Sequence, residues 1–245
     1  MVDDRFTIEP LGDQAFLLRF CDEPNRYCFD RIRAFDEAVS RKRVQGIVEL
    51  SPAYTSLAVY YDPLLISALD LEQFLRKVQG DQSGFLRSDN SGSSPQSHSL
   101  ARELLVPVCY DLEFGHDLEF VASSHGMNCS EVVEIHTAAS YFVHMIGFLP
   151  GFPYLGGLSS RIATPRKSSP RLQVPAGSVG IAGNQTGIYP IDSPGGWQII
   201  GRSPWQFFNL NHTPPSKIQA GDTVRFVSIG LNEFREIQNE SIGLE

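Results

Sequence analysis

The feature that most constrains the fold is the density of glycine and proline between Tyr141 and Arg202. This stretch holds 11 of the 21 glycines and 7 of the 16 prolines in the chain. Glycine and proline mark turns, and here they separate short apolar runs. Such runs lie at residues 179–182, 188–189, 197–200 and 224–229. Short apolar segments between Gly/Pro turns predict a β-barrel or a β-sandwich.

The N-terminal part of the chain alternates between strand-like and helix-like patterns. Strand patterns occur at residues 6–8, 15–20, 47–50 and 57–61. Apolar residues at helical spacing predict one helix over Tyr27–Arg41 and a second one further on. The second helix starts near Ser67, where Asp70 resembles a capping-box partner, and Gly80 is its expected stop. The order β-β-α-β-β-α predicts a small α+β sandwich with the helices on one face.

Residues Asp81–Ser99 have the composition of a linker, with seven serines in nineteen residues. Serine, glycine and proline together mark a loop between structured segments, so we place a domain boundary here. The chain after Ile229 is polar and is expected to fray. We therefore expect an α+β sandwich domain at 1–82, a Ser-rich linker at 83–100, a mainly-β barrel domain at 101–232 and a polar tail at 233–245.

The beginning of the second domain has its own pattern. A strand is expected at Glu103–Val108, followed by helices at Asp117–His125 and Ser130–Ala139. Asn128 precedes the second of these helices and Glu131 lies three residues on, which predicts an N-terminal cap.

Composition disfavours several classes of protein. The chain is 42% hydrophobic and 20% charged, as is usual for a globular protein. No apolar run reaches the roughly 20 residues that a membrane span needs, and the N-terminus lacks the apolar region of a signal peptide. We therefore expect a cytoplasmic protein. In that reducing compartment the four scattered cysteines, Cys21, Cys28, Cys109 and Cys129, are expected to be free thiols.

The charge of the chain is negative but uneven. A formal net charge of −8 argues against nucleic acid or an anionic membrane as the main partner. Within residues 141–202 only Asp192 is acidic, whereas five residues are basic. We call these five the basic island: Arg161, Arg166, Lys167, Arg171 and Arg202. It indicates a small anionic ligand or an acidic partner, although arginines lying over a sheet edge explain the charge equally well.

Familiar catalytic motifs are missing from the sequence. There is no Walker-type phosphate loop, no G-x-G-x-x-G and no H-E-x-x-H, and the six histidines lack the spacing of a metal site, so we expect no metal. Residues 176–180 resemble a nucleophile elbow around Ser178, but a strand and a turn follow where the elbow needs a helix, so we reject Ser178 as a nucleophile. Because Asp192 is the one acid in the Gly/Pro-rich region, no acid/base pair is visible. Catalytic residues stay unassigned.

The most distinctive segment is Gly147–Gly157, which combines glycines, prolines and aromatics. Aromatics held on a rigid loop suit the wall of a ligand pocket or the anchor of an interface. The same loop could simply pack its aromatics against the end of the barrel, and on the residues alone this simpler interpretation is favoured.

A set of motifs in fixed order identifies a family resemblance. The motifs are Gly147–Leu158 (GFLPGFPYLGGL), Pro165-Arg166 with Pro170-Arg171, Val174–Val179 (VPAGSV), Gln185–Pro190 (QTGIYP) and Ser193–Trp197 (SPGGW). Further support comes from Pro10–Asp13, Pro52–Leu57, Val108–Asp111 and Gly221–Phe226. Together they closely resemble the family of 5-oxoprolinase B subunits, also called the KipI family or allophanate hydrolase subunit 1. Ser203 and Asn209 depart from the family, which usually has Thr and a nearby Asp there; Asn209 weakens any acid/base role at that point.

The resemblance implies a fold and a function. It implies an α+β N-terminal domain followed by a mainly-β, cyclophilin-like barrel. It implies an accessory subunit of an ATP-dependent 5-oxoprolinase that converts 5-oxoproline to glutamate and that is inactive alone. The implied partners are an allophanate hydrolase subunit 2-like protein (the C-type component of 5-oxoprolinase) and the A-type component of 5-oxoprolinase, with ATP bound somewhere in the complex. Related sequences form part of the carboxyltransferase region of urea carboxylases.

Two alternative functions belong to other classes. One branch of the family inhibits a sensor histidine kinase, which makes a regulatory inhibitor the main alternative. Prolyl isomerase activity is the weakest hypothesis, because a cyclophilin-like fold does not by itself carry the function.

We expect the ligand to bind between the Gly147–Gly157 loop and the Pro194–Trp197 turn. Guanidinium groups bind carboxylate or phosphate bidentately, and Gln185 and Tyr189 could hydrogen-bond an amide or lactam, or only complete a turn. The expected ligand-binding residues are Phe148, Pro150, Gly151, Phe152, Tyr154, Arg166, Arg171, Gln185, Tyr189, Gly195, Gly196, Trp197 and Arg202. Arg166 and Arg171 are the candidates for an anionic group, unless they are ordinary surface arginines.

Two further residues have open or structural roles. Trp197 could stack on a planar ligand, but sealing the end of the barrel is favoured, and Arg202 could point inward or outward. His136 lies on an expected helix among apolar residues, which is typical of a core histidine.

Overall fold

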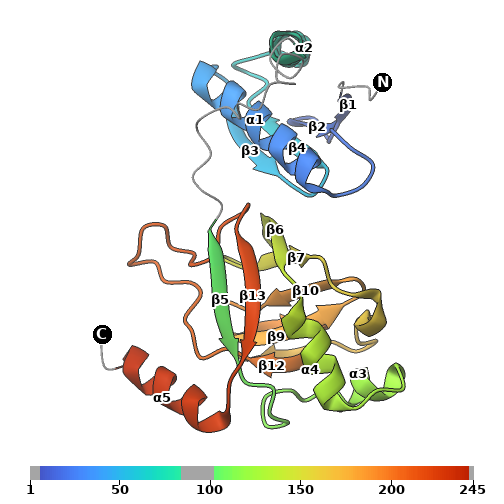
Figure 1. The fold of residues 1–245 in the computed structure, drawn as a ribbon. Coiled ribbons are helices and arrows are strands. Elements are labelled where there is room, and N and C mark those ends of the chain that lie inside the picture. Colours follow the sequence, from blue (N-terminus) through green and yellow to red (C-terminus); the bar gives the residue numbers. More distant parts are fainter. Residues whose placement is uncertain (1–5, 84–101, 243–245) are drawn as a thin grey trace, which may run out of the picture. The chain divides into compact units, whose positions relative to one another are not determined.

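The computed structural model describes residues 6–83 and 102–242. The chain divides into two compact units, residues 1–99 and 100–245, each with its own hydrophobic core (Figure 1). The Ser-rich linker expected at 83–100 lies, apart from Ser83, outside the described residues, and the domain boundaries expected from the sequence stay predictions. In the part of the chain that the structure describes, no helix has the length and apolar character needed to cross a membrane.

Unit 1 is a four-stranded antiparallel sheet with two helices. In chain order the elements are β1 (Thr7–Pro10), β2 (Ala15–Arg19), α1 (Arg26–Lys42), β3 (Ile47–Pro52), β4 (Ser56–Tyr61) and α2 (Ala68–Ser83). The strands lie in the order β1-β2-β4-β3. Both helices share one core with strand residues such as Leu18 and Leu57, which pair across β2 and β4. The predicted β-β-α-β-β-α order is confirmed.

Helix α1 shows why the sequence pattern is informative. Ile32, Phe35 and Val39 recur at helical spacing and are almost fully buried, so one stripe of the helix faces the core. Asn25 caps the first turn by accepting a hydrogen bond from the backbone N–H of Cys28 at 2.8 Å, which satisfies one donor that has no partner inside the helix.

Two expectations for unit 1 are wrong. Cys21 and Cys28 form a disulfide; the turn from β2 into α1 brings their Cα atoms to 6.0 Å, a normal distance for such a bond. Cys109 and Cys129 are free, as expected. Helix α2 continues to Ser83 instead of ending at Gly80; a glycine inside a helix weakens it by only about 1 kcal/mol, and the packing of α2 on α1 outweighs that.

Unit 2 is a nearly closed barrel with helices at its side. Its strands are β5 (Glu103–Val108), β6 (Tyr141–Ile146), β7 (Pro153–Gly156), β8 (Arg171–Val174), β9 (Ser178–Ala182), β10 (Gln185–Ile188), β11 (Ser193–Gly195), β12 (Gln198–Arg202) and β13 (Thr223–Ser228). Seven of them form one sheet in the order β12-β9-β10-β7-β6-β13-β5, and β8 pairs with β11. This arrangement is consistent with the cyclophilin-like barrel that the resemblance implies. Ser178 lies within β9 and is buried, which confirms it as a barrel residue.

The barrel closes where Cys109 meets β12. The backbones of Cys109 and Arg202 exchange two hydrogen bonds of 2.8 and 2.9 Å. A Cβ atom on the neighbouring Gly201 would lie 2.8 Å from the carbonyl oxygen of Cys109. Such a contact is too short, so closure depends on glycine at this position.

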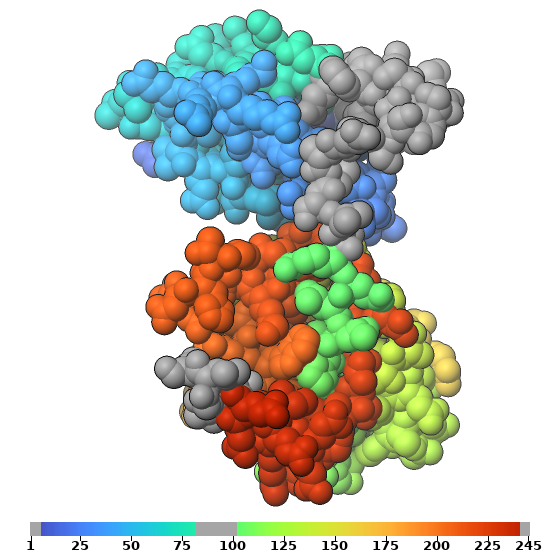
Figure 2. Space-filling model, turned by 60° about the vertical axis from the view of Figure 1, so that its left-hand side comes forward, coloured from blue at the N-terminus to red at the C-terminus, as the bar shows by residue number. Residues whose placement is uncertain are grey.

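The helices of unit 2 are α3 (Leu118–Ser124), α4 (Cys129–Ala138) and α5 (Leu231–Ile242), with a short 3₁₀ turn at Ser160–Ile162. The capping box of Asn128 and Glu131 is confirmed on α4. The frayed tail is a wrong expectation: the segment forms helix α5, whose Phe234 is 1% exposed and packs with Cys109. Figure 2 shows α5 (red) on the surface beside residues around β5 (green). Leu231 and Ile237 pack against the same cluster, so an apolar stripe holds this otherwise polar helix in place.

Candidate functional site

The Gly147–Phe152 loop is a tight turn that leads into β7. The backbone N–H of Phe152 donates to the carbonyl of Leu149 and the N–H of Gly147 donates to the carbonyl of Phe152, both at 3.0 Å. Pro150 and Gly151 occupy the centre of this turn, and Gly151 has a φ of +81°. Phe148 also has a positive φ, of +69°, and its side chain is 63% exposed. A bulky residue in this conformation is unusual and is often found at functional sites.

Aromatic rings seal the adjacent end of the barrel. The ring of Phe152 is fully buried, and its centroid lies 5.0 Å from that of Tyr154 and 5.3 Å from those of Tyr189 and Trp197. The rings meet edge to face, a favoured arrangement for aromatic pairs. Trp197 is 5% exposed, so its ring is packed within this cluster. The structure therefore brings the Gly147–Gly157 loop and the Pro194–Trp197 turn into contact.

Arg166 lies over this cluster and is exposed. Its guanidinium carbon is 5.9 Å from the centroid of Trp197, within the range of a cation–π contact. The segment around Arg166 is fastened on both sides of Trp197. The side-chain amide of Gln198 donates to the carbonyl of Pro165 at 2.9 Å, and the backbone N–H of Lys167 donates to the carbonyl of Gly196 at 2.7 Å.

Two phenols lie near this guanidinium. Burial raises the pKa of Tyr154 and of Tyr189 above the usual value. The charge of Arg166 partly offsets the rise for Tyr154, and the backbone N–H of Trp197 with the charges of Arg166 and Arg171 partly offsets it for Tyr189. The Tyr189 hydroxyl is buried beside the backbone of Gly195 and Trp197 and makes no hydrogen bond of normal geometry with the described residues. A Cβ at Gly195 would collide with this phenol, so the close approach requires glycine.

Arg171 and Lys167 are engaged elsewhere, by Asp117. Both terminal nitrogens of Arg171 donate to the Asp117 carboxylate at 2.8 Å, and Lys167 Nζ donates to it at 3.0 Å. The backbone N–H of Ile199 also donates to it at 2.7 Å. Burial alone would raise the pKa of Asp117, but the hydrogen bonds from Arg171, Ile199 and Lys167 outweigh burial and hold the pKa below its ordinary value. Arg171 therefore does not share the position of Arg166.

Two other expected site residues are also apart from Arg166. Arg202 Nε donates to the carbonyl of Ala176 at 2.8 Å, and its guanidinium lies over Phe114 at 5.9 Å. Gln185 lies in the hairpin to β9, at the end of β10 opposite to Tyr189.

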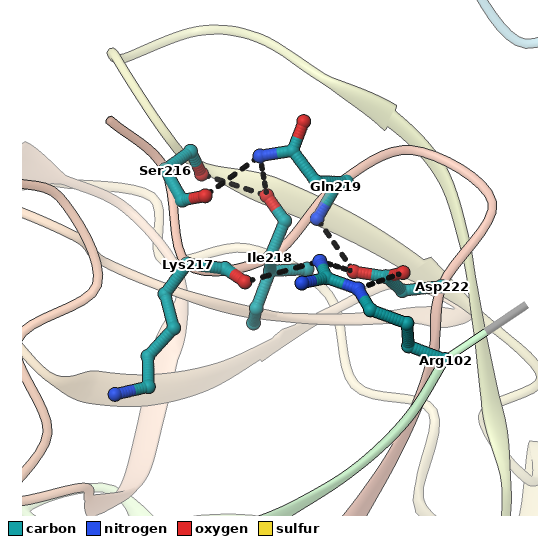
Figure 3. Close-up of polar contacts among 6 residues, drawn as sticks. All are labelled: Arg102, Ser216, Lys217, Ile218, Gln219 and Asp222. Carbon is teal, nitrogen blue, oxygen red and sulfur yellow. Dashed lines mark hydrogen bonds and ion pairs between the residues drawn. The ribbon is translucent and has the colours of Figure 1, made fainter. Parts of the chain in front are cut away.

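A polar cluster is built around the carboxylate of Asp222 (Figure 3). Arg102 donates to both carboxylate oxygens of Asp222, at 3.1 and 2.6 Å, and the backbone N–H of Gln219 donates to the same carboxylate at 2.8 Å. The Gln219 side chain donates to the carbonyl of Ser216 at 2.6 Å. A Cβ atom at Gly151 would lie 3.3 Å from Ser216 Oγ, so this fastened turn supports the loop from behind.

His136 is a core histidine, as predicted. It is fully buried, its Nδ1 lies 2.8 Å from the Tyr110 hydroxyl and its Nε2 lies 3.0 Å from Thr186 Oγ1. Thr186 Oγ1 donates to the carbonyl of Gly180 at 3.0 Å, so it accepts from Nε2–H, and Nδ1 accepts from Tyr110. Burial lowers the pKa of His136 to about 3. The imidazole is a satisfied, neutral member of the barrel core.

Sequence reasoning misses the importance of Asp117 and Asp222. Asp222 lies in one of the supporting family motifs, which is a usable signal. The pattern around Asp117 indicates only the start of a helix, and nothing in the sequence pairs it with a residue 54 positions away. Within the described residues there is no group of three or more His, Cys, Asp or Glu side chains that could hold a metal ion.

Comparison with solved structures defines the class of the fold. The chain superposes on the structure of Kluyveromyces lactis urea carboxylase with a TM-score of 0.76, covering 96% of this chain and 23% of that one at 20% identity. At that identity the likeness concerns the fold alone. The molecule thus has the fold of one part of a urea carboxylase. Residues 6–218 match the family described as carboxyltransferase domain, subdomain C and D, and the chain belongs to that family.

Two relatives, both named as the B subunit of 5-oxoprolinase, match most of the chain. The chain is 42% identical to the B subunit of 5-oxoprolinase from Bacillus subtilis over 243 residues, which is 97% of this chain and 98% of the relative. It is 41% identical to the B subunit of 5-oxoprolinase from Haemophilus influenzae over 187 residues, 76% of this chain and 82% of the relative. The family resemblance inferred from the motifs is confirmed.

Proposed function

We propose that this chain is an accessory subunit of an ATP-dependent 5-oxoprolinase, which opens the lactam of 5-oxoproline to give glutamate. Relatives of that name match it over most of their length. The observation that carries the subunit role is the set of side chains at the end of the barrel around Arg166. In the part of the chain that the structure describes, it offers an unpaired guanidinium beside phenols and an indole, whereas the nearby carboxylate of Asp117 is already bound by two cations. Such a set suits binding better than proton transfer.

The chemistry requires more than this chain supplies. A five-membered lactam is a poor electrophile, and transfer of phosphate from ATP to its oxygen would ease attack by water. Nucleotide phosphates are usually held by a glycine-rich loop and by several cations with Mg²⁺. The sequence has no such loop, and Arg171 and Lys167 are paired with Asp117. Because these residues do not fit a triphosphate, we propose that a partner protein of the complex binds ATP.

The proposed partners are the C-type and the A-type components of 5-oxoprolinase. Purified chain given ATP and 5-oxoproline should release neither phosphate nor glutamate, and it should co-elute with the C-type partner from a sizing column. Turnover by the rigorously purified single chain would contradict the subunit role. Binding to a sensor histidine kinase, with no binding to either partner, would favour the regulatory alternative.

A further inference from the structure

We propose that Arg166, backed by Trp197 and flanked by Tyr154 and Tyr189, binds the single carboxylate of a small planar amide. The inference deepens the proposed function and rests on it only for the choice of 5-oxoproline as the ligand. It separates Arg166 from Arg171, although the sequence motifs group the two together as anion-binding residues.

The first support is the state of the two arginines. Arg171 gives its guanidinium to Asp117 in a bidentate pair. Arg166 makes no hydrogen bond or ion pair with the described residues, and it is exposed. A guanidinium carries five N–H donors in a planar fork that matches a carboxylate. Its contact with Trp197, at 5.9 Å from the ring centroid, uses none of these donors in a hydrogen bond.

The second support is preorganisation. The residues on each side of Arg166 are hydrogen-bonded to the residues on each side of Trp197, through Gln198 to Pro165 and through Lys167 to Gly196. The backbone position of Arg166 is therefore set by Gly196 and by Gln198, the first residue of β12, and a ligand does not have to organise the segment. Fixing a binding group before the ligand arrives favours affinity.

The third support is the Tyr189 hydroxyl. The side chain is fully buried, and its O–H has no acceptor among the described residues, although its oxygen lies beside the backbone N–H of Trp197. A buried donor without an acceptor is unfavourable. An oxygen atom of a ligand held by Arg166 would supply that acceptor after a small shift of the Pro194–Gly196 turn.

The charge count favours a carboxylate over a polyphosphate. Lys167 and Arg171 both bind Asp117, so Arg166 is the one guanidinium of the segment from Arg166 to Arg171 that has no carboxylate partner among the described residues. One guanidinium matches one carboxylate. The lactam ring would then lie among aromatic side chains, which suit a flat, partly apolar group.

The test is a titration of the purified chain followed by NMR. The chain has two tryptophans, so its indole N–H region holds two signals, and W205F assigns that of Trp197. The probes are 5-oxoproline and 2-pyrrolidinone, which has the same lactam but no carboxylate. The variants are R166Q, R166K and Y189F, and R161Q is the matched control because Arg161 is another exposed arginine of the basic island.

We expect 5-oxoproline to shift the Trp197 signal in the unmodified chain and in R161Q with equal affinity. R166Q should weaken binding of 5-oxoproline at least tenfold, and the affinity of R166K should lie between those of R166Q and the unmodified chain. Y189F should weaken binding about threefold. The unmodified chain should bind 2-pyrrolidinone at least tenfold more weakly than 5-oxoproline. Equal affinity of R166Q and R161Q, or of the two probes, would overturn the inference.

The assembled enzyme separates this inference from the proposed function. If the complex turns over 5-oxoproline and R166Q raises KM at least tenfold with little change in kcat, both stand. An active complex whose KM is unaffected by R166Q overturns the inference and leaves the subunit role intact. An inactive complex together with Arg166-dependent binding overturns the proposed substrate reaction but supports the site. Absence of both binding and turnover overturns both.

Discussion

Asp117 and Arg171 form a bidentate ion pair across 54 residues of sequence, with both N–O distances at 2.8 Å. The carboxylate is 5% exposed and also binds Lys167 and the backbone of Ile199. One side chain therefore ties the start of α3, the segment that carries Arg166 and the strand β12. The pair explains why two cations of the basic island are not available to a ligand.

Removing the charge of Asp117 should destabilise unit 2. D117N leaves the cations of Arg171 and Lys167 without their partner, and breaking a buried pair in this way costs about 3–5 kcal/mol. Urea unfolding of the full chain measures the loss. The matched control is E119Q, an exposed acid on α3 that should change stability by less than about 0.5 kcal/mol. A D117N variant as stable as E119Q would show that the pair does not hold the barrel.

The ion pair of Asp117 and Arg171 should also make the free energy of unfolding depend on pH. The pKa of Asp117 in the folded chain lies below its ordinary value of 3.8. Its contribution to stability is therefore complete above about pH 4 and is lost as the pH falls through the lowered pKa. The difference in the free energy of unfolding between the unmodified chain and D117N should shrink as the pH falls below 3.8. A difference that stays constant down to about pH 2 would contradict the assignment.

His136 should stay neutral in the folded chain at any pH from about 8 down to about 4. Burial lowers its pKa from 6.5 to about 3. Between these two values the imidazole is protonated in the unfolded chain but neutral in the folded chain. Stability linked to this group is complete above pH 6.5 and declines as the pH falls from 6.5 toward 3. Nitrogen chemical shifts measured by NMR should report the Nε2–H form throughout. An imidazolium signal at about pH 5 would refute the buried network.

Reduction of the disulfide should weaken unit 1. Cys21 and Cys28 are seven positions apart, and closing so short a loop stabilises a fold by about 2–3 kcal/mol in the chain-entropy view. Thermal unfolding with and without a reducing agent measures the effect. The variant C21S should unfold like the reduced chain, whereas C129S should not, because Cys129 is a free thiol. Identical curves for C21S and the oxidised chain would mean that the bond carries no stability.

Local patterns predict much of the fold because they depend on neighbours in sequence. The spacing of Ile32, Phe35 and Val39 predicts α1, and Asn128 with Glu131 predicts the start of α4. The Gly/Pro turns predict a barrel, although they do not place β6, β8 and β11. The C-terminal helix shows the limit: Leu231, Phe234 and Ile237 recur at helical spacing, but the cluster that they pack into contains Cys109, which lies far away in sequence.

The candidate site is only partly predictable for the same reason. The aromatic loop and the turn before Trp197 are expected to meet, and they do. Pairing Arg166 with Arg171 is reasonable from composition, yet a carboxylate from another element binds Arg171. Which of two neighbouring arginines is free depends on a contact 54 residues away, and no local pattern encodes that.

The most direct test of the central claim is the release of glutamate from 5-oxoproline with ATP, measured for this chain together with its A-type and C-type partners. Each component is omitted in turn. The subunit role predicts glutamate release by the full mixture and none when this chain or ATP is left out. If the mixture releases as much glutamate without this chain, or none at all although the partners bind it, this chain is not a working subunit of a 5-oxoprolinase.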